Sequence, residues 1–215
     1  MNKIIIVDDH SLFREGIKLL LESNGFGKVI AEAENGLVFL DILKTTKPDL
    51  VVMDIEMPVM NGLEATKNAL KIYPDLKILV LTMLSERENY QDMINAGAMG
   101  FVLKTSGKKE FEKAIQTVMS GDSYFSNELL RQIIFNIETK QPNVAIQSEP
   151  IKLTSREVEV LTQLCQGLTV NEIAAKLFLS PKTIEAHRST LLKKTNTKNT
   201  LNLVLLAIKN KIVKI

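Results

Sequence analysis

The sequence is poor in cysteine and contains no long hydrophobic run. Its 215 residues include one cysteine, Cys165, so no internal disulfide can form, which excludes the disulfide-stapled scaffolds of small secreted proteins. The apolar run near the N-terminus is too short for the core of a signal peptide and ends at Asp8 and Asp9. No segment approaches the length of a membrane span. These absences predict a globular, cytoplasmic chain with no membrane partner.

Charge is nearly balanced overall but unevenly distributed. The formal net charge is only +2. Residues 1–125 hold 14 Lys and Arg against 18 Asp and Glu, a net charge of −4, whereas residues 150–215 hold 11 against 4, a net charge of +7. A basic, compact C-terminal segment is typical of nucleic-acid binding, although the same charge is equally compatible with a solubilising surface.

The first part of the chain alternates short apolar runs with longer amphipathic segments. The apolar runs are rich in β-branched residues and leucine, as expected of parallel strands buried on both faces. The predicted strands are Lys3–Val7, Lys28–Ala33, Leu50–Asp54, Lys77–Thr82 and Gly100–Leu103. The predicted helices are Leu12–Glu22, Leu37–Thr45, Leu63–Tyr73, Arg87–Ala96 and Lys109–Met119. Five such units predict an α/β fold with a doubly wound, five-stranded parallel sheet.

The pattern changes after residue 121. One more amphipathic helix is predicted over Asn127–Thr139 with Ser126 as its cap, and the aperiodic segment Gln141–Pro150 is typical of a linker. Residues 150–215 are predicted to form a small all-α domain with helices Ser155–Gln166, Val170–Leu177, Pro181–Thr195 and Asn199–Asn210. The chain is therefore predicted to have an α/β domain over residues 1–121, a linker with one helix over 122–149, and a helical domain over 150–215.

Polar side chains follow the predicted strands at their carboxyl ends, the edge at which open α/β sheets bind ligands. Asp8 and Asp9 follow the first strand, Asp54 closes the third, Thr82 ends the fourth and Lys104 follows the fifth. Three carboxylates in one pocket repel one another unless a cation sits among them, and Mg²⁺ suits such ligands. Any one of these acids alone is an ordinary start of a loop, but the full set at four strand ends indicates a functional site.

The segments around these residues resemble the receiver domain of two-component response regulators. They are IIIVDDH (Ile4–His10), VVMDIEMPVMNG (Val51–Gly62), LVLT (Leu79–Thr82) and AGAMGFVLK (Ala96–Lys104), and the resemblance covers about residues 1–121. It implies a flavodoxin-like domain in which Asp54 accepts a phosphoryl group from a cognate histidine kinase. It also implies that Mg²⁺, or Mn²⁺, is held by Asp8, Asp9, Asp54 and the backbone carbonyl of Glu56.

The same resemblance assigns roles to three further residues. Lys104 would pair with the phosphoryl oxygens, Thr82 would hydrogen-bond to them, and Phe101 would change rotamer in the switch. Phe101 has an alternative interpretation as an ordinary core phenylalanine. Such a protein catalyses only its own phosphoryl transfer and dephosphorylation, so we do not expect an enzyme acting on a separate substrate.

The helical domain resembles the LuxR-type helix-turn-helix output domain of NarL-like response regulators. The matching segments are LTSREVEVL, GLTVNEIAAKL and LSPKTIEAH, within about residues 150–215. The resemblance implies that the helix after Ser180 enters the major groove of double-stranded DNA. The residues predicted to face DNA are Lys182, Thr183, Glu185, Ala186, Arg188, Ser189, Lys193, Lys194 and Lys198.

These residues have two predicted roles. The lysines and Arg188 are candidates for phosphate contacts, which position the domain without reading sequence, although any single lysine could equally belong to a solvated face. Glu185, Ala186 and Ser189 are the candidate base contacts, since glutamate accepts from cytosine N4 and alanine touches a thymine methyl. Glu185 departs from the family, in which a basic residue is frequent at this position.

The predicted function is a transcription regulator that is switched by phosphorylation of Asp54. The resemblance implies homodimerisation on activation, with Val204, Ala207 and Lys211 as candidates for the interface. Two alternatives stay open: a binding module with a receiver fold that is never phosphorylated, and a phosphohydrolase with an Asp nucleophile. The second is disfavoured because haloacid-dehalogenase-type enzymes place their nucleophile after the first strand, whereas Asp54 closes the third.

Overall fold

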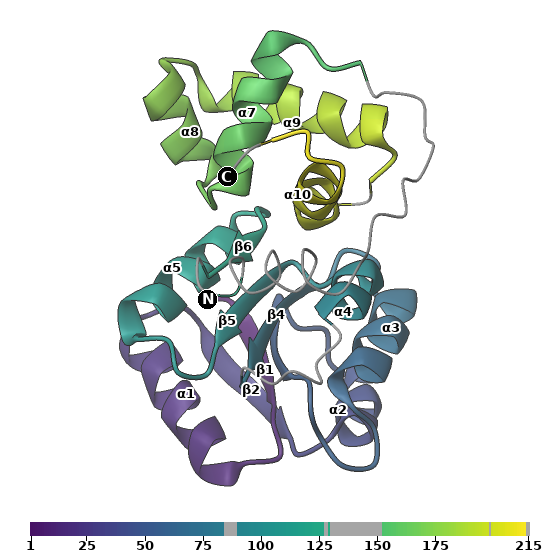
Figure 1. Cartoon of the computed structure of the whole chain (residues 1–215). Helices are drawn as coiled ribbons and strands as arrows, with labels where there is room; N and C mark the ends of the chain where they lie inside the picture. The colour runs from purple at the N-terminus through teal and green to yellow at the C-terminus, as the bar shows by residue number, and fades with distance from the viewer. Residues whose placement is uncertain (84–89, 127–128, 130–151, 198, 214–215) are drawn as a thin grey trace. The chain divides into compact units, whose positions relative to one another are not determined.

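A computed structural model describes residues 1–83, 90–126, 129, 152–197 and 199–213 of the chain (Figure 1). Within these residues the chain divides into two compact units, Met1–Tyr124 and Phe125–Ile215. No helix of the described part is long and apolar enough to cross a membrane. The predicted linker Gln141–Pro150 and most of the predicted helix Asn127–Thr139 lie outside the described residues.

The first unit is built on a sheet that contains all five predicted strands at their predicted bounds. They are β1 (Lys3–Val7), β2 (Lys28–Ala33), β3 (Leu50–Asp54), β4 (Lys77–Thr82) and β5 (Gly100–Leu103). Neighbouring strands pair in parallel in the order β2-β1-β3-β4-β5, which is the flavodoxin-like order. The strand order reverses between β1 and β3, so the loops after these two strands run in opposite directions. In open α/β sheets, ligands bind at the carboxyl ends of the strands at such a point.

The prediction of five strands was one strand short. A sixth strand, β6 (Tyr124–Phe125), lies beside β5 at the edge of the sheet. The backbone N–H of Tyr124 donates to the carbonyl of Met99 at 3.1 Å, which ties this segment to the start of β5. Two residues are too few to show a strand periodicity, so the sequence pattern carried no signal for β6.

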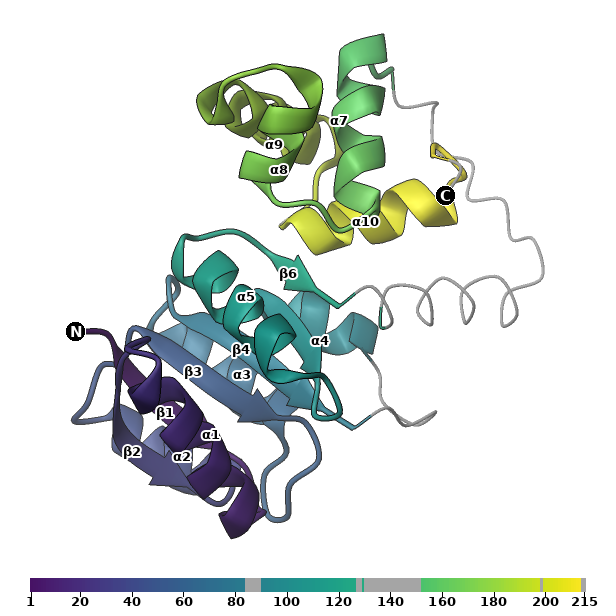
Figure 2. The ribbon, with the colours of Figure 1, turned by 90° about the vertical axis from the view of Figure 1, so that its left-hand side faces the viewer.

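Helices cover both faces of the sheet. Figures 1 and 2 show α1 (Ser11–Ser23) and α5 (Lys108–Met119) on one face, and α2 (Gly36–Leu43), α3 (Gly62–Ile72) and α4 (Tyr90–Ala96) on the other. The predicted helix Arg87–Ala96 is described only from Tyr90 onward. The sheet is therefore doubly wound, as predicted, and helix bounds differ from the predicted ones by one or two residues elsewhere.

The core between the sheet and α1 and α5 follows from the two periodicities of strand and helix. Alternate strand residues point to this side, as the pairs Ile4 and Ile6 on β1 and Leu79 and Leu81 on β4 illustrate. They pack against one stripe of each helix, which includes Phe111 on α5. These side chains are nearly or completely buried, so the strand ends that carry the polar residues are held in fixed positions.

The second unit contains α7 (Ser155–Cys165), α8 (Val170–Leu177), α9 (Pro181–Thr195) and α10 (Thr200–Lys209). Capping boxes start α7 at Thr154 and α8 at Thr169, and Ser180 caps α9 with a proline at its first position, as the sequence predicts. α9 packs against both α7 and α8. The arrangement of α8, a short turn and α9 is that of a helix-turn-helix.

Candidate functional site

Lys104 joins two buried aspartates at the carboxyl edge of the sheet. Its Nζ lies 2.7 Å from Asp54 Oδ2 and 2.7 Å from Asp8 Oδ2. The side chains of Lys104, Asp8 and Asp54 are only 7%, 3% and 6% exposed. Charges this far from water are tolerated only when they are paired and hydrogen-bonded, so these three groups form one electrostatic unit. A carboxylate oxygen of Asp9 lies within 4.8 Å of those of Asp8 and Asp54, so the structure brings together four of the five residues predicted to meet at this edge.

Backbone donors and a glycine hold the two aspartates in place. The backbone N–H of Ile55 donates to Asp54 Oδ1 at 2.8 Å, and that of His10 donates to Asp8 Oδ1 at 2.9 Å. Gly62 opens α3 directly behind the Asp54 backbone. A Cβ on Gly62 would lie 2.0 Å from the carbonyl oxygen of Asp54, so only glycine allows the loop after β3 to close this tightly.

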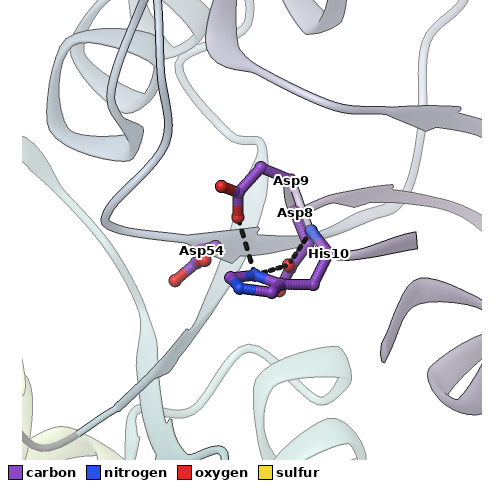
Figure 3. A group of neighbouring side chains, drawn as sticks. All are labelled: Asp8, Asp9, His10 and Asp54. Atoms are coloured by element: carbon purple, nitrogen blue, oxygen red, sulfur yellow. Dashed lines mark hydrogen bonds and ion pairs between the residues drawn. The ribbon is translucent and has the colours of Figure 1, made fainter. Parts of the chain in front are cut away.

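Asp9 and His10 complete the pocket on its outer side. Figure 3 shows the His10 ring turned toward both acids, with Nδ1 2.8 Å from Asp9 Oδ1 and 3.2 Å from Asp8 Oδ1. One potential metal ligand from each of Asp8, Asp9, His10 and Asp54 lies within 4.8 Å of the others. His10 was not among the predicted ligands; its side chain is 70% exposed, and no sequence motif indicated its contact with the acids.

Burial and ion pairing act in opposite directions on the charged pair. Burial raises the pKa of Asp54 above its usual range, and the hydrogen bond from Lys104 opposes but does not cancel this shift. Burial lowers the pKa of Lys104, but the hydrogen bonds to Asp54 and Asp8 outweigh it and the pKa is raised. Lys104 thus stays an ammonium at neutral pH, and it is the group that stabilises the ionised carboxylate of Asp54.

Thr82 lies beside this unit at the end of β4, and Phe101 lies on the adjacent strand β5. The backbone N–H of Lys104 donates to the Thr82 carbonyl at 2.8 Å, which sets the two residues side by side. The Thr82 side chain is fully buried, and its hydroxyl donates to the carbonyl of Met83 at 3.0 Å. Phe101 is also fully buried and pairs with Val80 in the sheet. The roles of both side chains stay predictions, as does that of the Glu56 carbonyl.

Two residues of α1 support the pocket and were not predicted. Arg14 donates from Nη1 to the carbonyl of Asp8 at 2.6 Å and lies 3.5 Å from Glu32, so it fixes the backbone that carries both acids. The ring of Phe13 lies 4.9 Å from Lys104 Nζ in a cation–π contact. Helical periodicity could place both residues toward the sheet, but no sequence motif indicated these partners.

The surface of α9 carries the residues predicted to contact DNA, and several of them have partners within the unit. Lys182, Ala186, Ser189 and Lys193 are exposed. Thr183 belongs to the N-cap, since its backbone N–H donates to Ser180 Oγ at 3.1 Å. Lys198 lies outside the described residues.

Lys194 is the predicted phosphate contact whose partner was least expected. Its Nζ lies 2.8 Å from both carboxylate oxygens of Glu157, whose side chain is 6% exposed and also completes the capping box of α7. Together with backbone and side-chain hydrogen bonds to Thr154, this ion pair lowers the pKa of Glu157, with the Lys194 hydrogen bond as the largest cause. Lys194 therefore links the end of α9 to the start of α7, which competes with a contact to phosphate.

Val204 and Ala207, the predicted interface residues of α10, are buried within the described chain, whereas Lys211 is exposed. Apolar residues are buried around much of α10, including Leu201, Leu203 and Leu205. The prediction that Val204 and Ala207 pair two copies would require them to be uncovered first.

Both units match known families. The family described as response regulator receiver domain matches residues 4–116, and the family described as bacterial regulatory proteins, luxR family, matches residues 152–207. The chain is 36% identical over 207 residues to the uncharacterized transcriptional regulatory protein YhcZ of Bacillus subtilis (strain 168), across 96% of this chain and 95% of that protein. It is 34% identical over 215 residues to the oxygen regulatory protein NreC of Staphylococcus epidermidis, across 98% and 99% of the two chains.

Solved structures agree over the same length. A structure of two RcsB dimers bound to two parallel DNAs is similar with a TM-score of 0.56 and 25% identity, across 97% of this chain and 98% of that chain. The two family matches, the full-length relatives and the strand order all indicate the same family. The chain belongs to the two-component response regulators that join a receiver domain to a LuxR-type, NarL-like helix-turn-helix output domain, a family of transcriptional regulators and not of enzymes.

Proposed function

We propose that phosphorylation of Asp54 by a cognate histidine kinase switches the DNA binding of this regulator. The observation that carries the proposal is the buried carboxylate of Asp54 with the Lys104 ammonium 2.7 Å away. A nucleophile held in one direction beside a cation has the two properties that phosphoryl transfer needs: in-line positioning and neutralisation of spreading charge. In this proposal the receiver spans residues 1–121, the linker 122–149 and the output domain 150–215.

The transfer requires one partner of Asp54 to move. One carboxylate oxygen forms a bond to phosphorus while the bond from phosphorus to the kinase histidine nitrogen breaks, and that nitrogen keeps the electron pair. Oδ1 accepts from the Ile55 backbone and Oδ2 is paired with Lys104. Lys104 is the partner that can move, because its ammonium ends a flexible stem, and it then pairs with the phosphoryl oxygens.

The donor set of the pocket fits a hard divalent cation. Asp8, Asp9 and Asp54 carry three negative charges and Lys104 carries one positive charge, so an excess of two negative charges is left for Mg²⁺ or Mn²⁺ to balance. Asp8, Asp9 and Asp54, with the Glu56 carbonyl, would hold the ion. When bound, it supplies charge neutralisation for the carboxylates and the incoming phosphoryl oxygens.

Thr82 and Phe101 are proposed to report the phosphorylated state. The Thr82 hydroxyl now donates to the neighbouring Met83 carbonyl, and a phosphoryl oxygen on Asp54 offers it a stronger, charged acceptor. Drawing this hydroxyl inward frees space along the strand, and the Phe101 ring on the adjacent strand would change rotamer. The receiver would thereby shift between two conformations.

The output domain is proposed to bind double-stranded DNA through α9 as a homodimer. Support comes from the exposed Lys182 and Lys193 on α9, from the net charge of +7 over residues 150–215, and from the similarity to RcsB, which was solved as dimers on DNA. A two-fold dimer predicts half-sites about one helical turn apart.

The deciding experiment compares wild type with Asp54→Ala in DNA binding, with and without a small phosphodonor and Mg²⁺. We expect donor-dependent binding in the wild type and none in Asp54→Ala. Asp75→Ala is the matched control, since Asp75 is exposed and precedes β4 at the opposite edge of the sheet. An Asp54→Ala protein that responds to donor as wild type does would contradict the proposal, and would favour a receiver fold that acts without phosphorylation.

A further inference from the structure

Two residues of α9 with opposite charge form an ion pair near the start of the helix. Arg188 Nη2 lies 2.7 Å from Glu185 Oε2, across one helical turn. The N-terminal half of a recognition helix is the part that contacts base edges. Glu185 therefore places a negative charge on the surface that is proposed to face the negatively charged DNA. This negative charge is paired with the positive charge of Arg188 on the same helix.

The two side chains differ in how firmly they are held. Arg188 falls on the same helical stripe as the buried Ile184 and Leu191, four residues after one and three before the other, and its side chain is only 17% exposed. Glu185 lies off that stripe, and its side chain is 44% exposed. The arginine stem is thus enclosed by the domain, and its guanidinium supports a carboxylate that faces outward.

We infer that Glu185 and Arg188 act together as a base-reading pair. The pair makes the protein prefer DNA sites that carry a cytosine at one position of each half-site. This inference rests on the proposed DNA binding by α9 and names what that surface recognises. Glu185 is the base contact, and Arg188 is a positioning residue that acts through it.

An acid on a DNA-binding surface carries an electrostatic cost. A carboxylate without a partner, brought among phosphates, is repelled by them and loses its hydration, so it lowers affinity for every sequence. Arg188 removes that penalty because the pair is neutral as a unit. A planar guanidinium also fixes the carboxylate rotamer, so Glu185 is already oriented before it meets DNA and loses little conformational freedom on binding.

The hydrogen-bonding chemistry of the Glu185 carboxylate determines which base it fits. An ionised carboxylate only accepts hydrogen bonds. In the major groove cytosine offers the N4 amino donor, whereas guanine offers only acceptors and adenine sets its N7 acceptor beside the N6 donor. Cytosine is the base that satisfies Glu185 without placing a second acceptor against it. A glutamine at this position would instead donate to N7 and accept from N6, and so would favour adenine.

The test is selection of binding sites from a library of randomised DNA duplexes by the full-length protein, treated with phosphodonor and Mg²⁺. For the wild type we expect cytosine at one position of each half-site, favoured about tenfold over other bases. In Glu185→Gln the same position should change to adenine while the rest of the site stays the same.

Glu159→Gln is the matched control for this change. Glu159 forms an ion pair with Arg156 at the same three-residue spacing, but on α7, so the variant removes the same charge from the same domain. Its selected sequence should equal that of the wild type. A Glu185→Gln profile identical to wild type would overturn the assignment of Glu185 as a cytosine contact.

The positioning role of Arg188 is tested by two variants. Arg188→Met keeps the packed stem and removes the charge, and it should lose the tenfold cytosine preference, whereas Arg188→Lys should regain part of it. Retention of the full preference by Arg188→Met would overturn the positioning role. A wild type that enriches no duplex at all would instead overturn the proposed DNA binding, an outcome distinct from either result above.

Discussion

The two units of this regulator place their charged residues in opposite ways. In the receiver pocket, Asp8, Asp54 and Lys104 are withdrawn from water, with side chains between 3% and 7% exposed. On α9 the cations at Lys182 and Lys193 are exposed. A buried charge constrains geometry and chemistry because it has few possible partners, whereas an exposed charge contributes long-range attraction and little else.

The comparison explains why each arrangement suits its proposed task. Phosphoryl transfer depends on the position of a few atoms, and burial of the Asp54–Lys104 pair restricts where those atoms can lie. DNA binding depends on counter-ion release over many phosphates, which exposed lysines provide without a fixed geometry. The Glu157–Lys194 pair is intermediate, because the acid is buried and the lysine is partly exposed, and it links the end of α9 to the start of α7.

The largest effect is expected from removing the buried cation of the pocket. Lys104→Met keeps the stem but removes the ammonium between Asp8 and Asp54, and the phosphoryl oxygens then lose their pairing with it. We expect phosphorylation by a small phosphodonor to slow by about 100-fold, measured as the rate of incorporation. Lys108→Ala is the control, because this exposed lysine lies away from the three buried charges and pairs with Glu112 one turn along α5, and its rate should equal wild type. A Lys104→Met rate within a few-fold of wild type would contradict the claim that the buried lysine contributes far more to phosphoryl transfer than an exposed lysine does.

The next effect concerns the cation that balances the acids. Mg²⁺ at about 100 times its dissociation constant should raise the free energy of unfolding of the receiver by about 2.7 kcal/mol. Asp9→Ala should abolish most of this gain, since it removes a predicted ligand, while Asp75→Ala should keep all of it. The measurement is thermal unfolding with and without Mg²⁺, and equal gains in both variants would place the ion elsewhere.

A smaller effect is expected at the intermediate pair. Glu157→Ala removes the capping box of α7 and leaves Lys194 without its partner, so the output domain should lose about 2 kcal/mol of unfolding free energy. Glu172→Ala removes the equivalent, exposed capping residue of α8 and should cost about 1 kcal/mol. Urea unfolding at pH 7 measures both, and equal losses would show that burial of Glu157 adds nothing.

The same pair predicts a pH dependence. The pKa of Glu157 is lowered in the folded state, so its contribution is fully present above the ordinary value of 4.5 and is lost as pH falls through the lower folded-state pKa. The difference in stability between wild type and Glu157→Ala should therefore shrink on acidification below that value. A difference that stays constant from pH 7 to pH 3 would contradict this assignment.

The smallest effect on stability is expected at an exposed cation of α9. Lys193→Ala should change the free energy of unfolding by no more than about 0.5 kcal/mol. It should nevertheless reduce the slope of log affinity for DNA against log salt concentration by about 1, because one phosphate contact is lost. Lys209→Ala, an exposed lysine of α10 outside the predicted DNA face, should leave the slope unchanged.

The receiver fold was predictable because short apolar runs indicate its strands and longer amphipathic segments indicate its helices. Most of the five predicted strands are apolar between their ends, and polar residues stand at their carboxyl ends, so both the strand bounds and the meeting of Asp8, Asp54 and Lys104 followed from the sequence. The strand β6 did not follow, since two residues carry no periodicity. The supporting contacts of Arg14 also did not follow, because a helix residue facing the sheet edge has many possible partners.

The surface of α9 was predictable only in part, for a physical reason. Helical spacing gives the face on which a residue lies, but not which neighbour a long side chain chooses. Lys194 donates a hydrogen bond to Glu157, a residue 37 positions earlier in the chain, and no local sequence pattern indicates such a contact. The Glu185–Arg188 pair did have a signal, since an acid three residues before a base on one helix is a known pairing distance.

The account depends on Asp54 as the carrier of the phosphoryl group. Peptide mapping by mass spectrometry, after donor treatment with Mg²⁺ and reduction of the acyl phosphate with borohydride, tests this directly by marking the modified side chain. The account predicts the mark on Asp54 alone. A mark on Asp8, Asp9 or any other residue, or no mark at all, would contradict it.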